Sequence, residues 1–208
     1  MKRLAIVGAA MLFVLWASPA LGQGIGAHAG LTFATATGDD VDEADYKTDL
    51  SFGAYLTFDL APTLSIRPEL NYMAFGAEVS DVDFTGTLDI RYVQVPVLLE
   101  LSLPTPGARP YLFAGPAVSF EASCTVEAES GGITASADCD DADILERKSV
   151  MWDLIGGAGL GFGLGPGEAS IGVRYDMGLT SLDDSDQEAD IRNQAISVMI
   201  GFSLMLGM

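Results

Sequence analysis

Few side chains in this 208-residue sequence have types and spacings that suggest chemistry. The only two cysteines, Cys124 and Cys139, lie in one acidic stretch. If the protein is exported, as its first residues indicate (see below), an even number of cysteines favours a disulfide over a metal site. We therefore expect a Cys124–Cys139 disulfide that orders the stretch. A labile, regulatory dithiol is the alternative.

A set of charged side chains forms the second candidate site. Each lies on the less apolar face of a segment of alternating polarity, so a β-strand would turn all of them to one side. If the strands close into a barrel, as argued below, this side is the lumen. We therefore call these residues the lumen charges: Arg67, Glu69, Glu100, Asp153, Arg174 and Asp176. Charges inside a narrow barrel must be paired or reach water, so we expect the two arginines to pair with Glu69, Glu100 or Asp176. The alternative is a gated, narrow ion path, because glycines in 156–165 would leave one wall nearly bare.

No catalytic group and no cofactor site is expected. His28 is the only histidine, and no spacing places a serine and a carboxylate beside it, as a serine hydrolase requires. The Gly-rich segment 156–165 opens no helix, so it is not a phosphate-binding loop. The acidic runs DDVDEAD and DCDDAD lack the spacing of an EF-hand, so no defined metal site is expected. Divalent cations are expected only as loose partners of the acidic loops.

Eight segments that alternate apolar and other residues must position these side chains. A period of two indicates a β-strand with one apolar face. The clearest example runs from Tyr92 to Phe120 and contains two such segments joined by a Pro/Gly turn. Each segment has about the 9–11 residues with which a tilted strand crosses a bilayer. The expected strands are 24–33, 50–60, 64–73, 93–102, 111–120, 152–164, 169–179 and 196–206.

Short turns alternate with four long acidic stretches between these segments. The long stretches are 38–49, 78–89, 121–148 and 182–193. All but six of the 29 acidic residues lie there, and no residue of the apolar faces is charged. An even strand count with short periplasmic turns and long extracellular loops is typical of an outer-membrane barrel. A water-soluble, lipocalin-type barrel is the alternative, but it would turn its apolar residues inward.

The first residues have the layout of a secretory signal peptide. Lys2 and Arg3 precede an apolar run at 4–16, and Ala20 and Gly22 fit the −3 and −1 positions of a cleavage site. That run is too short for a comfortable transmembrane helix, which is the alternative. We expect a signal peptide at 1–22 and one barrel domain at 23–208. The formal net charge of −19 argues against nucleic acid as a partner.

Irregular pairing is expected at four places. Pro68, Pro96 and Pro116 lie within strands, and proline cannot donate to a ladder, so bulges or local breaks are expected there. The alternation also slips by one residue within 88–93, as a bulge would cause.

Several segments resemble the PorT-like outer membrane β-barrel family. YVQVPVLLEL and ARPYLFAGPAVSF are similar to its central hairpin; SIRPELNYMAFGA, DLIGGAGLGF and ASIGVRYDMGL resemble its third, sixth and seventh strands. The resemblance covers nearly all of the chain after the signal peptide. It implies an eight-stranded barrel in a Gram-negative outer membrane, with no defined activity for most members. Such barrels usually end on an aromatic residue read by the insertion machinery, whereas this chain ends at Met208, and Phe202 is the nearest substitute.

The sequence thus predicts an all-β fold: a closed, antiparallel, eight-stranded transmembrane barrel with up-and-down order. The expected function is not enzymatic. It is a structural or surface-interaction role carried by acidic extracellular loops, and the alternative is a narrow porin-like channel for ions or very small solutes. The expected partners are outer-membrane lipid, lipopolysaccharide and the barrel insertion machinery, and we expect a monomer.

Overall fold

The computed structural model describes residues 23–37, 47–81, 84–103, 105–130, 133–139, 150–180 and 192–206. The expected signal peptide, 1–22, lies outside these residues, as does much of the four acidic stretches. In the part of the chain that is described, no helix is long and apolar enough to cross a membrane.

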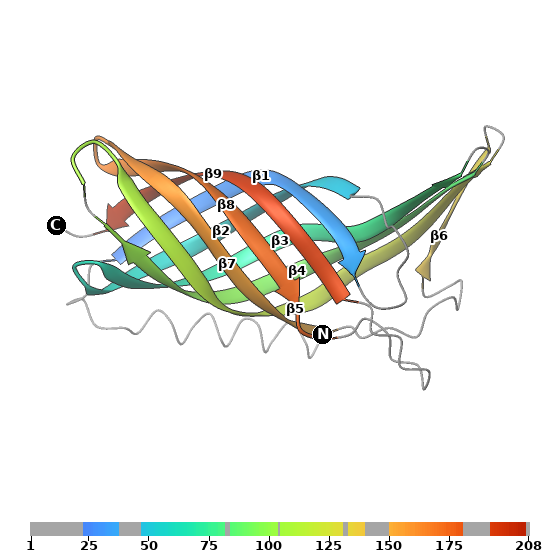
Figure 1. Ribbon diagram of the computed structural model, residues 1–208, viewed down its shortest axis with the longest axis horizontal. Helices are drawn as coiled ribbons and strands as arrows, with labels where there is room; N and C mark the ends of the chain where they lie inside the picture. The colour runs from blue at the N-terminus through green and yellow to red at the C-terminus, as the bar shows by residue number, and fades with distance from the viewer. Residues whose placement is uncertain are drawn as a thin grey trace.

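The described residues form nine antiparallel strands, and eight of them close a barrel (Figure 1). Around the barrel each strand pairs with its chain neighbours, except that β5 pairs with β7, and β9 returns to pair with β1. This closure confirms the fold expected from the sequence. The strands are β1 (Gln23–Thr37), β2 (Lys47–Ala61), β3 (Leu64–Asp81), β4 (Phe84–Ser102), β5 (Arg109–Ser130), β6 (Ile133–Asp138), β7 (Val150–Leu164), β8 (Gly167–Gly178) and β9 (Arg192–Leu206).

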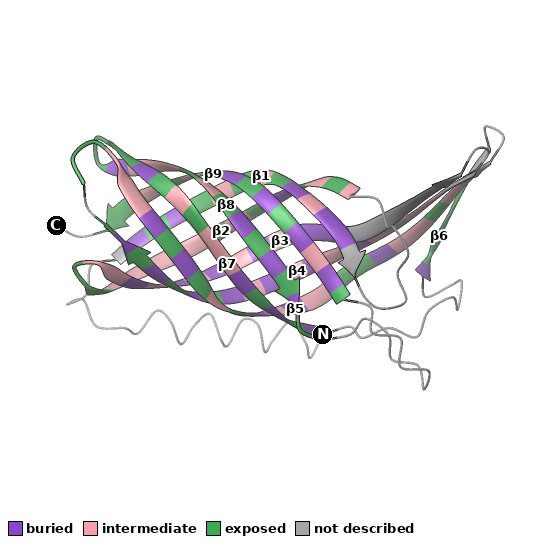
Figure 2. Cartoon of the chain, viewed as in Figure 1, coloured by how far each residue is buried: buried purple, intermediate pink, exposed green. Residues whose placement is uncertain are grey.

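The barrel turns its apolar side chains outward. Exposed and buried residues alternate along its strands, which Figure 2 shows as green and purple bands. Ile200 on the outside is 65% exposed, whereas the charged Arg174 on the inside is 2% exposed. In water such an apolar exterior would be unfavourable, but in hydrocarbon it carries no such penalty. The arrangement is therefore that of a membrane barrel rather than of a lipocalin-type one.

The two ends of the barrel differ. Gln23 pairs with Leu206, so β1 begins and β9 ends at the same rim. That rim also carries the short turns, in which Gly107 and Gly165 adopt positive φ values of 87° and 60° that side chains disfavour. We call it the turn end and the opposite rim the loop end.

Beyond the loop end, three strands continue as a sheet that projects from the barrel (Figure 1). We define this extended sheet as 73–81 of β3, 84–92 of β4, 121–130 of β5, and β6. The strand β5 changes partner there: it pairs with β7 up to Phe120 and with β6 from Thr125. The expectation that 78–89 and 121–148 are loops is therefore wrong for the described residues. Apolar residues still alternate there, as at Ile90 and Tyr92 or at Cys124 and Val126. The sequence predicts loops because acidic residues give these stretches the composition of a loop.

The three strand prolines interrupt the ladders without shifting them. Two consecutive residue pairs are missing beside each of Pro68, Pro96 and Pro116, and the register is the same on both sides of each gap. The expected local breaks are thus present, but no bulge occurs at the prolines. A shift does occur between Arg91 and Tyr92, which confirms the slip expected within 88–93.

Aromatic rings fill the lumen beside the glycines of β7. A Cβ atom added to Gly157 would lie 2.3 Å from Cζ of Phe113, and one added to Gly159 would lie 2.3 Å from the hydroxyl oxygen of Tyr111. The glycines therefore make room for two rings from β5, which form a small core with Leu98, Ala117 and Ile155. The expectation that this wall is nearly bare is wrong, because packing between β5 and β7 covers it.

We predict that Gly157→Val impairs folding. Besides meeting Phe113, its Cβ would lie 2.5 Å from the carbonyl oxygen of Val173, which cannot move without breaking the barrel. Overpacking of this kind costs about 1–3 kcal/mol or more. Gly163→Val is the matched control in the same strand, since a Cβ there meets nothing within 4 Å. Heat-modifiable electrophoretic migration measures the folded fraction, and equal fractions for the two variants would contradict the packing described.

Candidate functional site

Arg67 is the centre of a chain of ion pairs inside the barrel. Its Nε lies 2.8 Å from Oε1 of Glu69, its neighbour on the inner face of β3, and its Nη1 pairs with Glu100 on β4. The guanidinium also lies over the ring of Phe113, with Cζ 4.7 Å from the ring centroid. Arg67 is 7% exposed, so its charge is compensated inside the protein rather than by bulk water.

The chain extends from Arg67 in both directions. Toward the loop end, Arg174 pairs with Glu69. Toward the turn end, Arg109 Nη1 lies 2.9 Å from Glu100 Oε1, and Arg109 Nη2 lies 2.6 Å from Glu168 Oε1. We call this series the ion chain; its order is Glu168, Arg109, Glu100, Arg67, Glu69 and Arg174.

Two members of the ion chain were missed in the sequence. Arg109 and Glu168 begin their strands beside short turns, where alternation does not yet show which face they occupy. Their pairing depends on the register, which places Arg109 opposite Gly161. A Cβ on Gly161 would lie 2.4 Å from the Glu168 carboxyl carbon, so this glycine makes room for the pair. A glycine inside an alternating strand was the available signal.

Asp153 and Asp176, the other two lumen charges, form no salt bridge with the ion chain. The Nε2 atom of Gln94 is 3.3 Å from Oδ2 of Asp153 and 3.2 Å from Oδ1 of Asp176. The hydroxyl of Ser119 donates to Asp153. Gln94 and Ser119 are opposite each other on β4 and β5. We call these four residues the polar cluster; Gln94 and Ser119 were missed because uncharged inner-face residues carry no distinctive sequence signal.

His28 lies where its position in the sequence suggests, inside the barrel. Its ring stacks on Tyr55 with 5.8 Å between the ring centroids. With Arg67, Tyr111 and Ser170 among others, it lines a cavity of about 20 Å³. A buried water needs about 10–15 Å³, so this cavity has room for roughly one water molecule. It does not have room for a substrate.

An apolar cluster covers the polar cluster at the loop end of the barrel. We call it the loop-end cap; it consists of Ala34, Met73, Phe75, Ile90, Tyr92, Cys124, Cys139, Met151 and Ala195. Phe75 and Tyr92 meet edge to face at 5.5 Å between ring centroids. From the turn end to the loop end, the lumen is therefore filled by the ion chain with its aromatic rings, then by the polar cluster, then by the cap.

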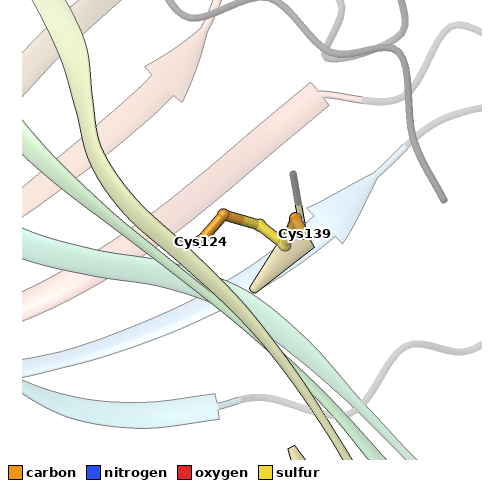
Figure 3. Close-up of a disulfide and its surroundings, with 2 residues drawn as sticks. All are labelled: Cys124 and Cys139. Carbon is orange, nitrogen blue, oxygen red and sulfur yellow. A yellow bond between two sulfur atoms is a disulfide. The ribbon is translucent and has the colours of Figure 1, made fainter. Parts of the chain in front are cut away.

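The two cysteines form a disulfide within this cap (Figure 3). Thr125 pairs with Asp138, so Cys124 and Cys139 are the next opposite residues in the same register. Their Cα atoms are 5.5 Å apart, and the residues are 6% and 1% exposed. The disulfide therefore holds the end of β6 against β5 where the extended sheet leaves the barrel.

We predict that Glu69→Gln strongly destabilises the barrel. This change leaves Arg174 buried without the carboxylate that it pairs with, and breaking a buried pair costs about 3–5 kcal/mol. Asp89→Asn is the matched control, because Asp89 pairs with Lys47 and Arg91 at partly exposed positions, where a pair contributes about 0–1 kcal/mol. Denaturant unfolding in lipid vesicles, followed by Trp152 fluorescence, measures both. Equal unfolding midpoints for the two variants would show that the ion pairs of Glu69 contribute no more to stability than a partly exposed pair does.

The fold is similar to that of known outer-membrane proteins. OprG from Pseudomonas aeruginosa, whose crystal structure is known, is 15% identical to this protein in sequence. The match covers 90% of this chain and 97% of OprG, with a TM-score of 0.53. Neisserial surface protein A is 11% identical, covers 88% and 97%, and has a TM-score of 0.52. Likenesses at this identity concern the fold alone. A comparison with curated proteins found no match.

A family model extends the comparison to the sequence itself. The model for the outer membrane protein beta-barrel domain matches residues 18–184, which is most of the chain. This match does not test the resemblance to the PorT-like family, which stays a prediction. The chain belongs to the outer membrane protein beta-barrel domain family, whose members lie in the outer membrane of Gram-negative bacteria.

Proposed function

We propose that this protein acts at the cell surface through its extended sheet and the acidic stretches around it, with the barrel as the membrane anchor. In barrels of this kind the long-loop end faces outward. The observation that carries the proposal is the strand β6, which pairs with β5 alone among the described residues and leaves its other edge open. An open strand edge can bind another extended chain.

The sheet is well suited to recognition because it is held in one shape. Ladder hydrogen bonds join β3 to β4 and β4 to β5 as far as Asp81, Phe84 and Ser130. The disulfide fixes β6 at its base. A surface that is already ordered loses less conformational entropy on binding than a flexible loop does.

The edge of β6 lacks the usual protection against pairing. Strand edges are commonly blocked by lysine, proline or a bulge, and the sequence of β6, ITASAD, contains neither lysine nor proline. Of its exposed residues, Ala135 to Ala137 are small and uncharged, and Asp138 at the base is the one that carries a charge. We therefore propose that the partner is an extended polypeptide segment that adds to the sheet as a further strand.

The charge of the extended sheet indicates which residues the partner segment should carry. The extended sheet has one basic residue, Arg91, against seven acidic ones: Glu78, Asp81, Asp89, Glu121, Glu127, Glu129 and Asp138. Opposite charge steers association, so a segment with lysine or arginine is favoured. Lipopolysaccharide phosphates carry the same sign as the sheet, and we propose that divalent cations bridge the two. Contact with the insertion machinery and a monomeric state also remain proposals.

The channel alternative has little support in the lumen. The ion chain and the rings of Tyr111 and Phe113 fill the lumen toward the turn end, and the loop-end cap covers the opposite end. An eight-stranded barrel encloses just enough space for its own side chains. We likewise propose that the protein is not an enzyme, since His28 borders a cavity with room for about one water molecule.

We predict that the refolded protein is electrically silent in a planar bilayer. No open path is expected through the ion chain, the polar cluster and the cap. Single-channel recording after heat-modifiable migration has confirmed folding is the measurement. Discrete openings whose conductance changes in Arg67→Ala would support the channel instead.

We also predict that β6 binds an extended cationic peptide. The probe is a fluorescent ten-residue peptide of alternating lysine and threonine, and anisotropy measures its binding to the protein in lipid nanodiscs. Replacing residues 133–138 by a Gly-Ser run should weaken binding at least about tenfold, or 1.4 kcal/mol, because a Gly-Ser run disfavours the strand that the peptide would pair with. Gly163→Val, a lumen change at the other end, should leave binding unchanged. Failure of the wild-type protein to bind, or equal binding by the β6 variant, would contradict the proposal.

A further inference from the structure

Two lumen carboxylates lack a counter-ion. Asp153 and Asp176 are 2% and 1% exposed. The salt bridges found among the described residues include neither of them, and Arg174, two residues before Asp176 on β8, pairs with Glu69 instead. The ion chain balances by itself, with three arginines against three glutamates. The two aspartates therefore add two negative charges that form no salt bridge with the ion chain, although Arg174 interacts with Asp176 at longer range.

The hydrogen bonds of the polar cluster are incomplete as well. One amide group, that of Gln94, serves both carboxylates through its Nε2 atom. Asp176 Oδ2 and Gln94 Oε1 are buried, and neither has a hydrogen-bond partner among the described residues. Gln94 is 0% exposed, and its Oε1 belongs to the amide that touches both carboxylates. Two buried oxygens at the cluster thus keep lone pairs that no donor of the described residues uses.

Electrostatics require that these charges be neutralised. A buried carboxylate without a counter-charge is very unfavourable, and two of them close together repel each other. Either two protons or one divalent cation would cancel both charges. The ligands on offer are all oxygens, from two carboxylates, an amide and a hydroxyl, and hard cations such as Ca²⁺ prefer oxygen ligands.

We propose that Asp153, Asp176, Gln94 and Ser119 bind one calcium ion inside the barrel, directly beneath the loop-end cap. A half-turn of the Gln94 amide exchanges Nε2 for Oε1 and places a carbonyl oxygen between the two carboxylates. The described residues contain no group of three or more His, Cys, Asp or Glu side chains that could hold a metal, so this site has only two carboxylates. With the amide and the hydroxyl it offers fewer than the roughly six to eight oxygen ligands of Ca²⁺, and water completes the set. The site is independent of the surface function proposed above.

The cap slows the exchange of the bound ion with solvent. Met151 and Tyr92 belong to the cap and lie next along their strands' inner faces from Asp153 and Gln94. The ion therefore enters while the barrel folds and leaves slowly afterwards. Cations held by the exposed acidic stretches would exchange rapidly, so retention through desalting distinguishes the two kinds of binding.

The test is to refold the full mature chain with CaCl₂, desalt it, and measure bound calcium by elemental analysis. About one ion per chain is expected, and unfolding in denaturant should begin at lower concentration when refolding is carried out in EDTA. The double variant Asp153→Asn, Asp176→Asn should retain no calcium and should be equally stable in CaCl₂ and EDTA, because its cluster is neutral. Asp89→Asn, which removes a carboxylate outside the lumen, should retain the ion.

Three results would overturn the proposal. The first is wild-type protein that retains no calcium and unfolds identically in CaCl₂ and EDTA, which would leave protons as the neutralising species. The second is calcium retained equally by the double variant, which would place the ion in the acidic stretches. The third is calcium lost from Asp89→Asn as readily as from the double variant. The wild-type measurement needs no variant, so misfolding of a variant cannot hide the answer.

Discussion

Hydrocarbon offers no hydrogen bonds, so every backbone group of this protein that lies in the membrane must be paired within the protein itself. Closure of the sheet through the β1–β9 and β4–β5 ladders meets that requirement. It also divides the side chains of each strand between lipid and lumen. The apolar exterior and the polar interior are both consequences of this one constraint.

The closed wall in turn dictates how the lumen is filled. Eight strands leave space only for side chains, so charged residues that point inward meet one another instead of bulk water. Arg67 shows the result most clearly, because it pairs with two glutamates and also lies over an aromatic ring. The glycines of β7 belong to the same packing, since they give Phe113 and Tyr111 their places.

The fold was largely predictable from the sequence, because lipid forces apolar residues into every second position of each membrane strand. The same alternation places Arg67, Glu69 and Arg174 on the inner face. It does not show which residues meet across strands, because that depends on register, and the pairing of Arg109 with Glu168 was missed for this reason. Gln94 was missed because an uncharged residue on the inner face carries no distinctive signal. The extended sheet was missed because its acidic residues give it the composition of a loop, although Ile90 and Tyr92 still alternate with charged residues. Its last strand, β6, has the sequence ITASAD and carries little apolar alternation.

The disulfide links the two parts of the molecule. Cys124 and Cys139 lie in the cap together with Met151 of β7, so the base of the extended sheet is packed into the mouth of the barrel. Beyond this base, β5 leaves β7 and takes β6 as its partner. The barrel thus holds the sheet in a fixed position at the membrane surface, although the sheet itself lies outside the ring of eight strands.

The central claim is that an ordered, disulfide-held sheet stands at the loop end of a closed barrel. Hydrogen–deuterium exchange of the protein in lipid nanodiscs tests it most directly. Amides of 125–130 and of β6 should exchange slowly in the oxidised protein and rapidly after reduction, while β8 and β9 stay protected in both states. Rapid exchange of β6 in the oxidised protein would contradict the account, because the surface proposed for binding would then not be ordered.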